Sequence, residues 1–174
     1  MSRPPDVRND NVVDALILAG ASGEIERTFV GQDLPRLSEA GVHEASVQAN
    51  LKFSEFDGQP VVTGRLGGEL VLTCQRCMNQ LVQRLDESFE VLVATEERAD
   101  EPGGFEPVVA NPSRFDVRWL VEDQALLALP LVAMHAPEEC EERGAVQEVE
   151  SEQQEATEAG QKPFQNLRDM MRKR

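Results

Sequence analysis

The stretch that decides the fold runs from Ala45 to Val93 and reads ASVQANLKFSEFDGQPVVTGRLGGELVLTCQRCMNQLVQRLDESFEVLV. Within it, apolar and polar residues alternate with a period of two in three successive runs. Successive side chains of a strand point to opposite faces, so this alternation is typical of strands with one buried face. The apolar positions are, run by run, Ala45, Val47, Ala49, Leu51 and Phe53; Val62, Leu66, Leu70, Leu72 and Cys74; and Leu81, Leu85, Phe89, Val91 and Val93. The sequence therefore predicts an antiparallel meander of three strands.

Turn residues separate the runs. Asp57-Gly58-Gln59-Pro60 follows the first run, and a glycine that can take positive φ makes a hairpin the expected connection. Cys74-Gln75-Arg76-Cys77 links the second run to the third. Gly67 and Gly68 interrupt the second run, and glycines inside a strand mark a bulge or a close approach of two backbones. We therefore expect a kink at this pair.

The flanking segments predict a few further elements. Further strands are candidates at Asp14 to Leu18 and at Glu24 to Val30, a short helix at Leu34 to Ala40, and an edge strand at Phe105 to Val109. Asp116 is a candidate N-cap for a helix that Pro130 ends, with apolar residues at helical spacing: Val117, Leu120, Val121, Ala125 and Ala128. The predicted fold class is α+β: a twisted antiparallel β-sheet or partly open barrel covered by one main helix.

Composition divides the chain into three parts. Residues 1–136 are predicted to form a single α+β domain. Residues 137–162 are rich in glutamate and poor in apolar residues, so they cannot offset their ordering entropy and we expect a disordered acidic segment. Residues 163–174 form a short basic amphipathic tail, with Phe164, Leu167, Met170 and Met171 at helical spacing. This tail is either a docking helix or a frayed terminus.

The charge and cysteine content limit the function classes. With 32 acidic and 17 basic residues the chain has a formal net charge of -15. Broad binding of nucleic acid depends on Lys and Arg that neutralise phosphates, so RNA contact is expected to be local or made through a partner. Three cysteines without a repeating framework fit a reducing compartment, and no apolar stretch approaches the length of a membrane span. We expect a soluble, cytoplasmic protein with no membrane partner.

The Cys-x-x-Cys pair at the second turn has three possible roles. Thiol exchange requires the first cysteine at a helix N-terminus, which a turn between strands does not provide. Two thiolates at this spacing can instead hold half of a tetrahedral metal site. His135 and Cys140 could join Cys74 and Cys77 to complete a Cys3His set for zinc. Simple packing of the thiols remains the alternative.

No constellation of residues indicates catalysis. His43 is expected on a strand and His135 in a loop, and neither belongs to a Ser-His-Asp or Cys-His arrangement that the sequence reveals. Glu122 and Asp123 could bind magnesium or act as acid and base, but two acids on the polar face of a helix need no such role. The sequence does not indicate an enzyme.

Two motifs carry a resemblance to a known family. Leu72 to Cys77, LTCQRC, and Val121 to Pro130, VEDQALLALP, resemble in order and separation the YceD family of bacterial and plastid proteins. The resemblance extends from the second strand to His135, includes Lys162 to Met170, and is weak in the N-terminal third. It implies a bacterial host and a role in accumulation or processing of 23S ribosomal RNA and in assembly of the large ribosomal subunit. Carried onto this chain, the family pattern falls on Cys74, Arg76, Cys77, Glu122, Asp123, Leu129 and Pro130, followed by the region of His135 and Cys140. Some relatives carry further cysteines after the position of Cys140, where this chain has Glu141-Glu142-Arg143-Gly144.

Arg76 has two interpretations. Held between two thiols, its guanidinium could bind a phosphate or a carboxylate of a partner. Alternatively, Arg76 could form an internal salt bridge to Glu122 or Asp123 and hold the helix against the turn. Two function classes follow: a non-catalytic ribosome-assembly factor that binds assembly proteins or a large-subunit precursor, and a small metal- or thiol-dependent enzyme acting on RNA or a protein substrate.

Overall fold

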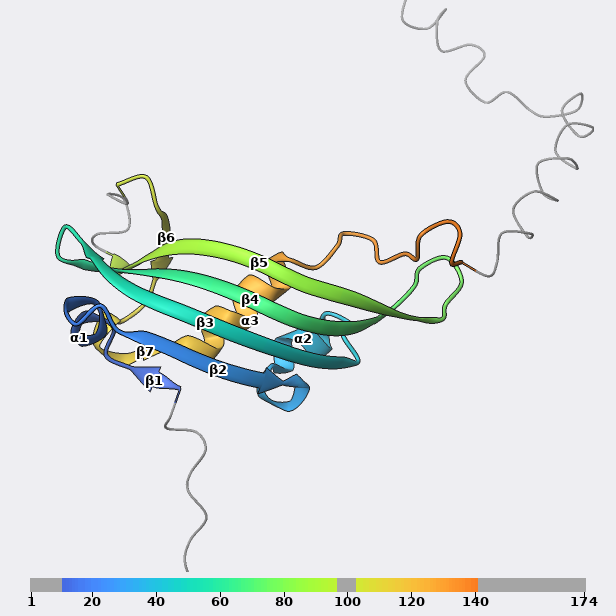
Figure 1. Ribbon diagram of the computed structural model, residues 1–174, viewed down its shortest axis with the longest axis horizontal. Helices are drawn as coiled ribbons and strands as arrows, with labels where there is room; N and C mark the ends of the chain where they lie inside the picture. The colour runs from blue at the N-terminus through green and yellow to red at the C-terminus, as the bar shows by residue number, and fades with distance from the viewer. Residues whose placement is uncertain (1–10, 97–102, 141–174) are drawn as a thin grey trace, which may run out of the picture. The chain divides into compact units, whose positions relative to one another are not determined.

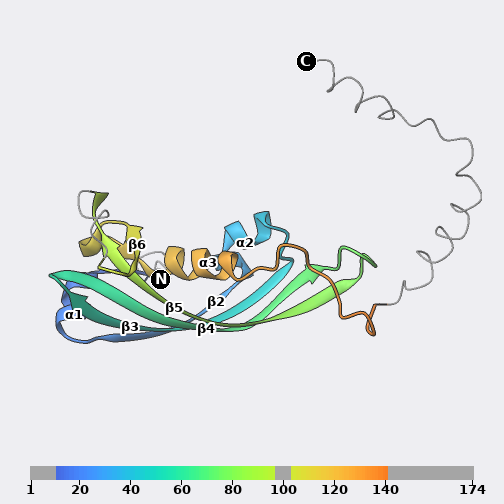
Figure 2. The ribbon, with the colours of Figure 1, turned by 90° about the horizontal axis from the view of Figure 1, so that it is seen from above.

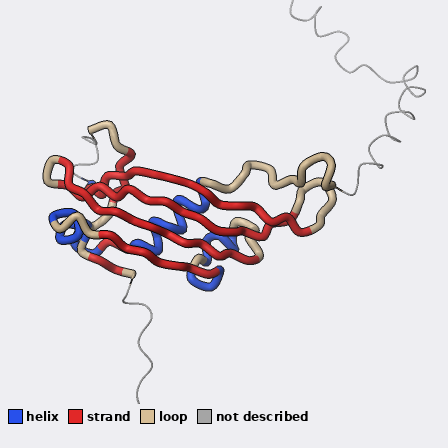
Figure 3. The backbone as a smooth tube through the Cα atoms, viewed as in Figure 1, coloured by secondary structure: helices blue, strands red, loops and turns tan. Residues whose placement is uncertain are grey.

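The computed structural model describes residues 11–96 and 103–140. The strands are β1 (Val12–Val13), β2 (Glu24–Val30), β3 (Glu44–Phe56), β4 (Gln59–Thr73), β5 (Gln80–Ala94), β6 (Glu106–Val109) and β7 (Phe115–Asp116). The helices are α1 (Ala15–Gly20), α2 (Pro35–Glu39) and α3 (Val117–Leu127), with short 3-10 turns η1 (Gly31–Asp33) and η3 (Pro112–Arg114). Figures 1 and 3 show a long sheet as the main feature of the fold.

The predicted meander is confirmed. The strands β3, β4 and β5 pair antiparallel along nearly their whole lengths, with Val47 opposite Gly68 and Gly68 opposite Leu85. Asp57 and Gly58 connect β3 to β4, and both have positive φ, 48° and 71°. Positive φ at both central residues is the conformation of a tight hairpin turn, which asparagine, aspartate and glycine adopt most readily. The alternating pattern and the turn residues thus set the register.

The sheet is open and mixed. Its order is β2-β3-β4-β5-β6, and the first and last strands do not close on each other, so the partly open barrel is not the form adopted. All pairs in this sheet are antiparallel except β5 with β6, which is parallel, so the predicted antiparallel sheet becomes mixed at the edge formed by β6. A tight hairpin cannot join parallel neighbours, and residues 95–105 separate β5 from β6 in the sequence. Pro107 fits in β6 because edge strands tolerate proline.

Gly68 marks a close approach of two backbones rather than a bulge. The β4 pairings with β3 and β5 continue through Gly67 and Gly68 without an extra residue. Gly68 has φ of 152°, and a Cβ atom built on it would overlap the carbonyl oxygen of Ser46 on β3. Gly68 therefore lets β3 and β4 lie close at the middle of the sheet, which is one of the two roles that the sequence indicated for the glycine pair.

Helix α3 covers one face of the sheet, as predicted (Figure 2). Its N-cap is Asp116, whose Oδ1 accepts hydrogen bonds from the backbone N–H of Arg118 at 3.0 Å and of Trp119 at 3.2 Å. A side-chain acceptor at this position satisfies N–H groups that have no partner within the helix. The helix ends three residues before Pro130, and its buried apolar residues are Val117, Leu120, Val121 and Ala125. They join the inward-facing residues of β3, β4 and β5 in a single core.

The N-terminal predictions are partly right. Glu24–Val30 is a strand, and a short helix occupies Pro35–Glu39. The segment from Asp14 to Leu18, a candidate strand, is instead the start of helix α1. Asp14 is its N-cap and accepts a hydrogen bond from the backbone N–H of Ile17 at 3.0 Å. Ala15 and Ala19, four residues apart, are the buried positions, which is the spacing of one helix face.

The compact unit that contains the sheet ends at Met134, and a second unit begins at His135. Of the second unit the structure describes residues 135–140. The predicted acidic segment beyond Cys140 and the predicted basic tail lie outside the described residues, so the three-part division of the chain stays a prediction. Within residues 11–96 and 103–140, no helix combines the length and the apolar character that a membrane crossing requires.

Candidate functional site

The turn between β4 and β5 is a tight thiol-bearing loop. The backbone N–H of Cys74 donates to the carbonyl of Asn79 at 2.9 Å, and the N–H of Met78 donates to the carbonyl of Cys74 at 2.9 Å. These bonds fold the chain back on itself between the two strands. Cys74 is fully buried and Cys77 is 8% exposed, although a turn of this kind usually lies on the surface. The turn thus places two thiols together and shields them from water.

The four residues of the predicted ligand set form a group that could hold a metal ion. Cys74, Cys77, His135 and Cys140 each offer one ligand atom, and the four atoms lie within 4.8 Å of one another. The three cysteines are not in disulfide bonds, and all are buried. Zinc–sulfur bonds of about 2.3 Å in a tetrahedron give ligand-to-ligand distances of about 3.8 Å, which lies within this limit of 4.8 Å. A Cys3His set of this kind could therefore bind a metal ion.

Gln75 ties the turn to the segment that follows α3. Its backbone N–H donates to the carbonyl of Ala133 at 2.8 Å. This bond connects two parts of the chain that are far apart in sequence, within the same compact unit. The chain that leaves α3 is thereby held against the cysteine turn two residues before His135.

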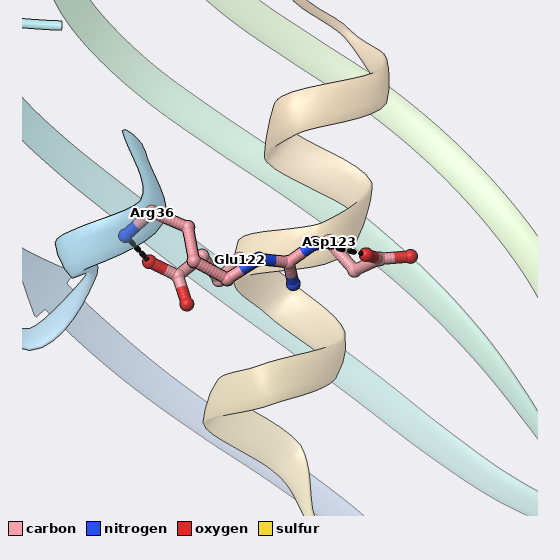
Figure 4. A network of polar contacts seen from close by, with 3 residues as sticks. All are labelled: Arg36, Glu122 and Asp123. Atoms are coloured by element: carbon pink, nitrogen blue, oxygen red, sulfur yellow. Dashed lines mark hydrogen bonds and ion pairs between the residues drawn. The ribbon is translucent and has the colours of Figure 1, made fainter. Parts of the chain in front are cut away.

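Glu122 and Asp123 bind Arg36 of α2 (Figure 4). The backbone N–H of Arg36 donates to Glu122 Oε1 at 2.6 Å, and Arg36 Nη2 donates to Asp123 Oδ1 at 2.8 Å. The guanidinium carbon of Arg36 also lies 6.0 Å from the centre of the Trp119 ring, within the range of a cation–π contact. Glu122 is only 4% exposed, so its carboxylate supports the first turn of α2 from inside the fold. The two acids therefore join α3 to α2.

Replacing Glu122 by alanine is expected to lower the free energy of unfolding by about 2 kcal/mol, because a partly buried N–H at the start of α2 loses a buried, charged acceptor. Glu122→Gln keeps an acceptor and is expected to lose about half as much. Asp123→Ala is the matched control: its ion pair is partly exposed, with side chains 40% and 29% accessible, and is expected to contribute less than about 1 kcal/mol. Urea unfolding measures all three, and equal losses for Glu122→Ala and Asp123→Ala would contradict the role of Glu122.

Comparison with known proteins assigns the family. Residues 62–171 match the model of the family described as large ribosomal RNA subunit accumulation protein YceD. The chain belongs to the YceD family. A YceD relative in Haemophilus influenzae, named large ribosomal RNA subunit accumulation protein YceD, is 37% identical over 119 residues, which are 65% of this chain and 68% of the relative. No solved structure matches the chain.

The YceD match begins inside β4 and includes the cysteine turn, α3 and all four residues of the ligand set. The elements before it, from β1 to β3, lie outside the match, in agreement with the weak resemblance of the N-terminal third. Arg36 belongs to this unmatched part, although it binds Glu122 and Asp123 of the matched part. The two acids of the α3 motif therefore bind an arginine that lies outside the family match.

Arg76 does not form the internal salt bridge considered from the sequence. It is half-buried in the turn, and neither a hydrogen bond nor an ion pair joins it to Glu122 or Asp123, all three of which the structure describes. The acids bind Arg36 instead. Arg36 lies 86 positions from Glu122 in the sequence, so no local pattern indicates that it binds these acids in place of Arg76. The other interpretation, a contact with a partner, stays open.

Pro130 lines an open cleft of about 470 Å³ beside the turn. Leu129 and Ala133 from the segment after α3 line it, as do Thr73 at the end of β4 and Gln75 of the turn. His43 also lines it, with its Nε2 2.7 Å from Thr73 Oγ1, a role that the sequence did not reveal. Leu131 and Val132 expose apolar side chains at this cleft. Exposed apolar residues around a cleft are a feature of surfaces that bind other molecules.

Proposed function

We propose that this chain is a non-catalytic accessory factor for 23S ribosomal RNA accumulation or processing and for assembly of the large ribosomal subunit. The observation that carries the proposal is the family match over residues 62–171, which includes both the cysteine turn and α3. The names of the family and of the Haemophilus influenzae relative refer to large ribosomal RNA subunit accumulation. The factor acts in the cytoplasm, and its partners are ribosome-assembly proteins or a large-subunit precursor.

The bound metal in this proposal is a structural zinc ion. Structural zinc sites use four protein ligands, whereas catalytic sites use three and leave one position for water or substrate. Cys74, Cys77, His135 and Cys140 provide all four ligands. A closed set of this kind supports a role for the ion in fixing the turn, and it leaves no coordination position for a reacting molecule.

The partner-binding residues are Arg76 and Pro130, on the turn and beside the cleft next to it. Arg76 supplies a cation to a phosphate or carboxylate in a chain whose formal net charge is -15. A single guanidinium suits local contact with RNA or with an acidic protein group, and the acidic body disfavours any broader contact with RNA. Glu122 and Asp123 serve this surface indirectly, by holding α3 to α2.

Replacing Arg76 by alanine tests this surface in a bacterium whose own copy of the gene has been deleted. We expect a reduced level of mature 23S ribosomal RNA and loss of co-sedimentation with large-subunit precursors, with the free energy of unfolding changed by less than about 0.5 kcal/mol. Arg114→Ala, an exposed arginine outside both motifs, is the control and is expected to behave as the unaltered protein.

Two outcomes would count against the proposal. Normal 23S ribosomal RNA in the Arg76→Ala strain would remove Arg76 from the partner surface. Failure of the unaltered protein to sediment with precursors, together with a hydrolytic activity lost on chelation, would favour the small metal-dependent enzyme instead.

A further inference from the structure

Among the described residues, strand β5 has no neighbouring strand on one of its edges over most of its length. It spans Gln80–Ala94, but β6 pairs only with its last four residues, from Val91 to Ala94 (Figure 1). The residues before Val91 have β4 on one side and, in the described parts of the chain, no strand on the other. An edge of this length presents backbone donors and acceptors to any strand that can reach it.

Two hydrogen bonds show which residues of β5 direct their backbone N–H and C=O groups away from β4. The carbonyl of Ala94 accepts from the backbone N–H of Ala110 on the β6 side, and the carbonyl of Arg84 accepts from the Nε2 of Gln83. Backbone groups of alternate residues point to the same side of a strand, and the pairing with β4 contains no bulge. The outward residues are therefore Val82, Arg84, Asp86, Ser88 and Glu90. Among described residues, no other main-chain group bonds to their outward N–H and C=O groups.

The charges on this edge are complementary to those on the same edge of a second copy of the chain. When two copies of β5 lie antiparallel about a twofold axis at Leu85, Arg84 of each copy faces Asp86 of the other. In this register Val82 faces Ser88. Both residues of each such pair direct their backbone N–H and C=O groups toward the other copy, so the pair can exchange two hydrogen bonds. Asp86 already binds Arg65 through Oδ1, at 3.0 and 3.2 Å, and its other oxygen can accept from the second copy.

The neighbouring registers are electrostatically worse. An axis at Arg84 would place the two Arg84 side chains directly opposite each other, and an axis at Asp86 would do the same with the two aspartates. Like charges directly opposite are destabilising in antiparallel pairs. On the other face, the axis at Leu85 places Leu85 against Leu85 and Leu81 against Phe89, which are apolar contacts. Hydrogen bonding, charge and apolar contacts therefore favour the axis at Leu85 over the axes at Arg84 and Asp86.

We propose that the β5 edge is the interface of a homodimer, in which two five-stranded sheets join as one continuous sheet through antiparallel β5 strands. The partner is a second copy of this chain, because the antiparallel arrangement places Arg84 of each copy opposite Asp86 of the other. Each chain carries a formal net charge of -15, and at about 0.15 M salt the repulsion between the bodies is screened beyond about 8 Å. The inference is independent of the ribosomal role and of the metal.

Exchanging the charges of Arg84 and Asp86 tests the proposal, with the dimer Kd of the purified full chain measured by sedimentation velocity. We expect a dimer, with a dimer Kd raised at least about tenfold by Arg84→Asp or by Asp86→Arg, because either change sets like charges opposite at two symmetric positions. The double variant restores the opposite charges in reversed order, and its Kd is expected to return to within about threefold of the original. Circular dichroism confirms that each variant is folded.

A backbone variant tests the hydrogen bonds separately. Ser88→Pro removes an outward N–H that β4 does not use, and proline is tolerated on a strand edge, so a folded monomer is expected. Ser88→Thr keeps the N–H and is expected to remain dimeric. An unaltered chain that stays monomeric at about 100 μM would overturn the proposal. So would a double charge variant that dimerises no better than the single variants, or a dimeric Ser88→Pro.

Discussion

Replacing Gly68 by alanine is expected to lower the free energy of unfolding by more than about 3 kcal/mol, a large part of the stability of a domain this size. The added Cβ would overlap the carbonyl oxygen of Ser46, which is backbone of β3 and cannot move without separating the strands. The φ of 152° at Gly68 is also a conformation that side chains rarely adopt. Both effects act at the centre of the sheet, between Val47 and Leu85.

Gly67→Ala is the matched control, because it tests the adjacent glycine on the same strand. A Cβ at Gly67 meets nothing within 4 Å, and Gly67 is not among the positive-φ glycines. We expect its free energy of unfolding to change by less than about 1 kcal/mol. Urea unfolding of the two variants, followed by circular dichroism, gives both values. Losses of similar size would mean that the glycine pair does not act through the close approach at Gly68.

The sequence carried strong local signals for the meander and α3. Alternation with a period of two identifies the inward residues of β3, β4 and β5 without any tertiary information, and Asp116 and Pro130 bracket α3. The short run after Asp14 was ambiguous, because five or six apolar residues fit a buried strand as well as a helix. Burial of Ala15 and Ala19 on one side resolves it as a helix in the fold. The local sequence pattern therefore identifies the type of long elements and leaves the type of a short element ambiguous.

Long-range partners could not be predicted in the same way. The ligand set was predicted from residue chemistry, because only one other cysteine and two histidines were available to the Cys-x-x-Cys pair. The partner of Glu122 and Asp123 had no such restriction among 17 basic residues, and Arg36 is 86 positions away from Glu122 in the sequence. The parallel pairing of β6 with β5 is likewise not indicated by any local pattern.

Removal of metal is expected to produce the second large effect. The purified full chain should contain about one zinc ion, and a chelator in excess should lower the Tm by about 10 °C, because a ligand at about a thousand times its Kd stabilises the folded state by about 4 kcal/mol. The readouts are elemental analysis and thermal unfolding. If the thiols only pack in the interior, the protein will contain no stoichiometric zinc and the chelator will leave the Tm unchanged.

The two histidines of the chain provide the matched test of this site. His135 belongs to the ligand set, whereas His43 lies beside Thr73, with its Nε2 2.7 Å from Thr73 Oγ1. His135→Ala is expected to lose most of the bound zinc, and Cys140→Ser to do the same, since each removes one of four ligands. His43→Ala is expected to retain about one zinc ion. Retention of zinc by His135→Ala and Cys140→Ser together would show that the metal, if bound, is held elsewhere, because two thiolates alone do not complete a tetrahedral site.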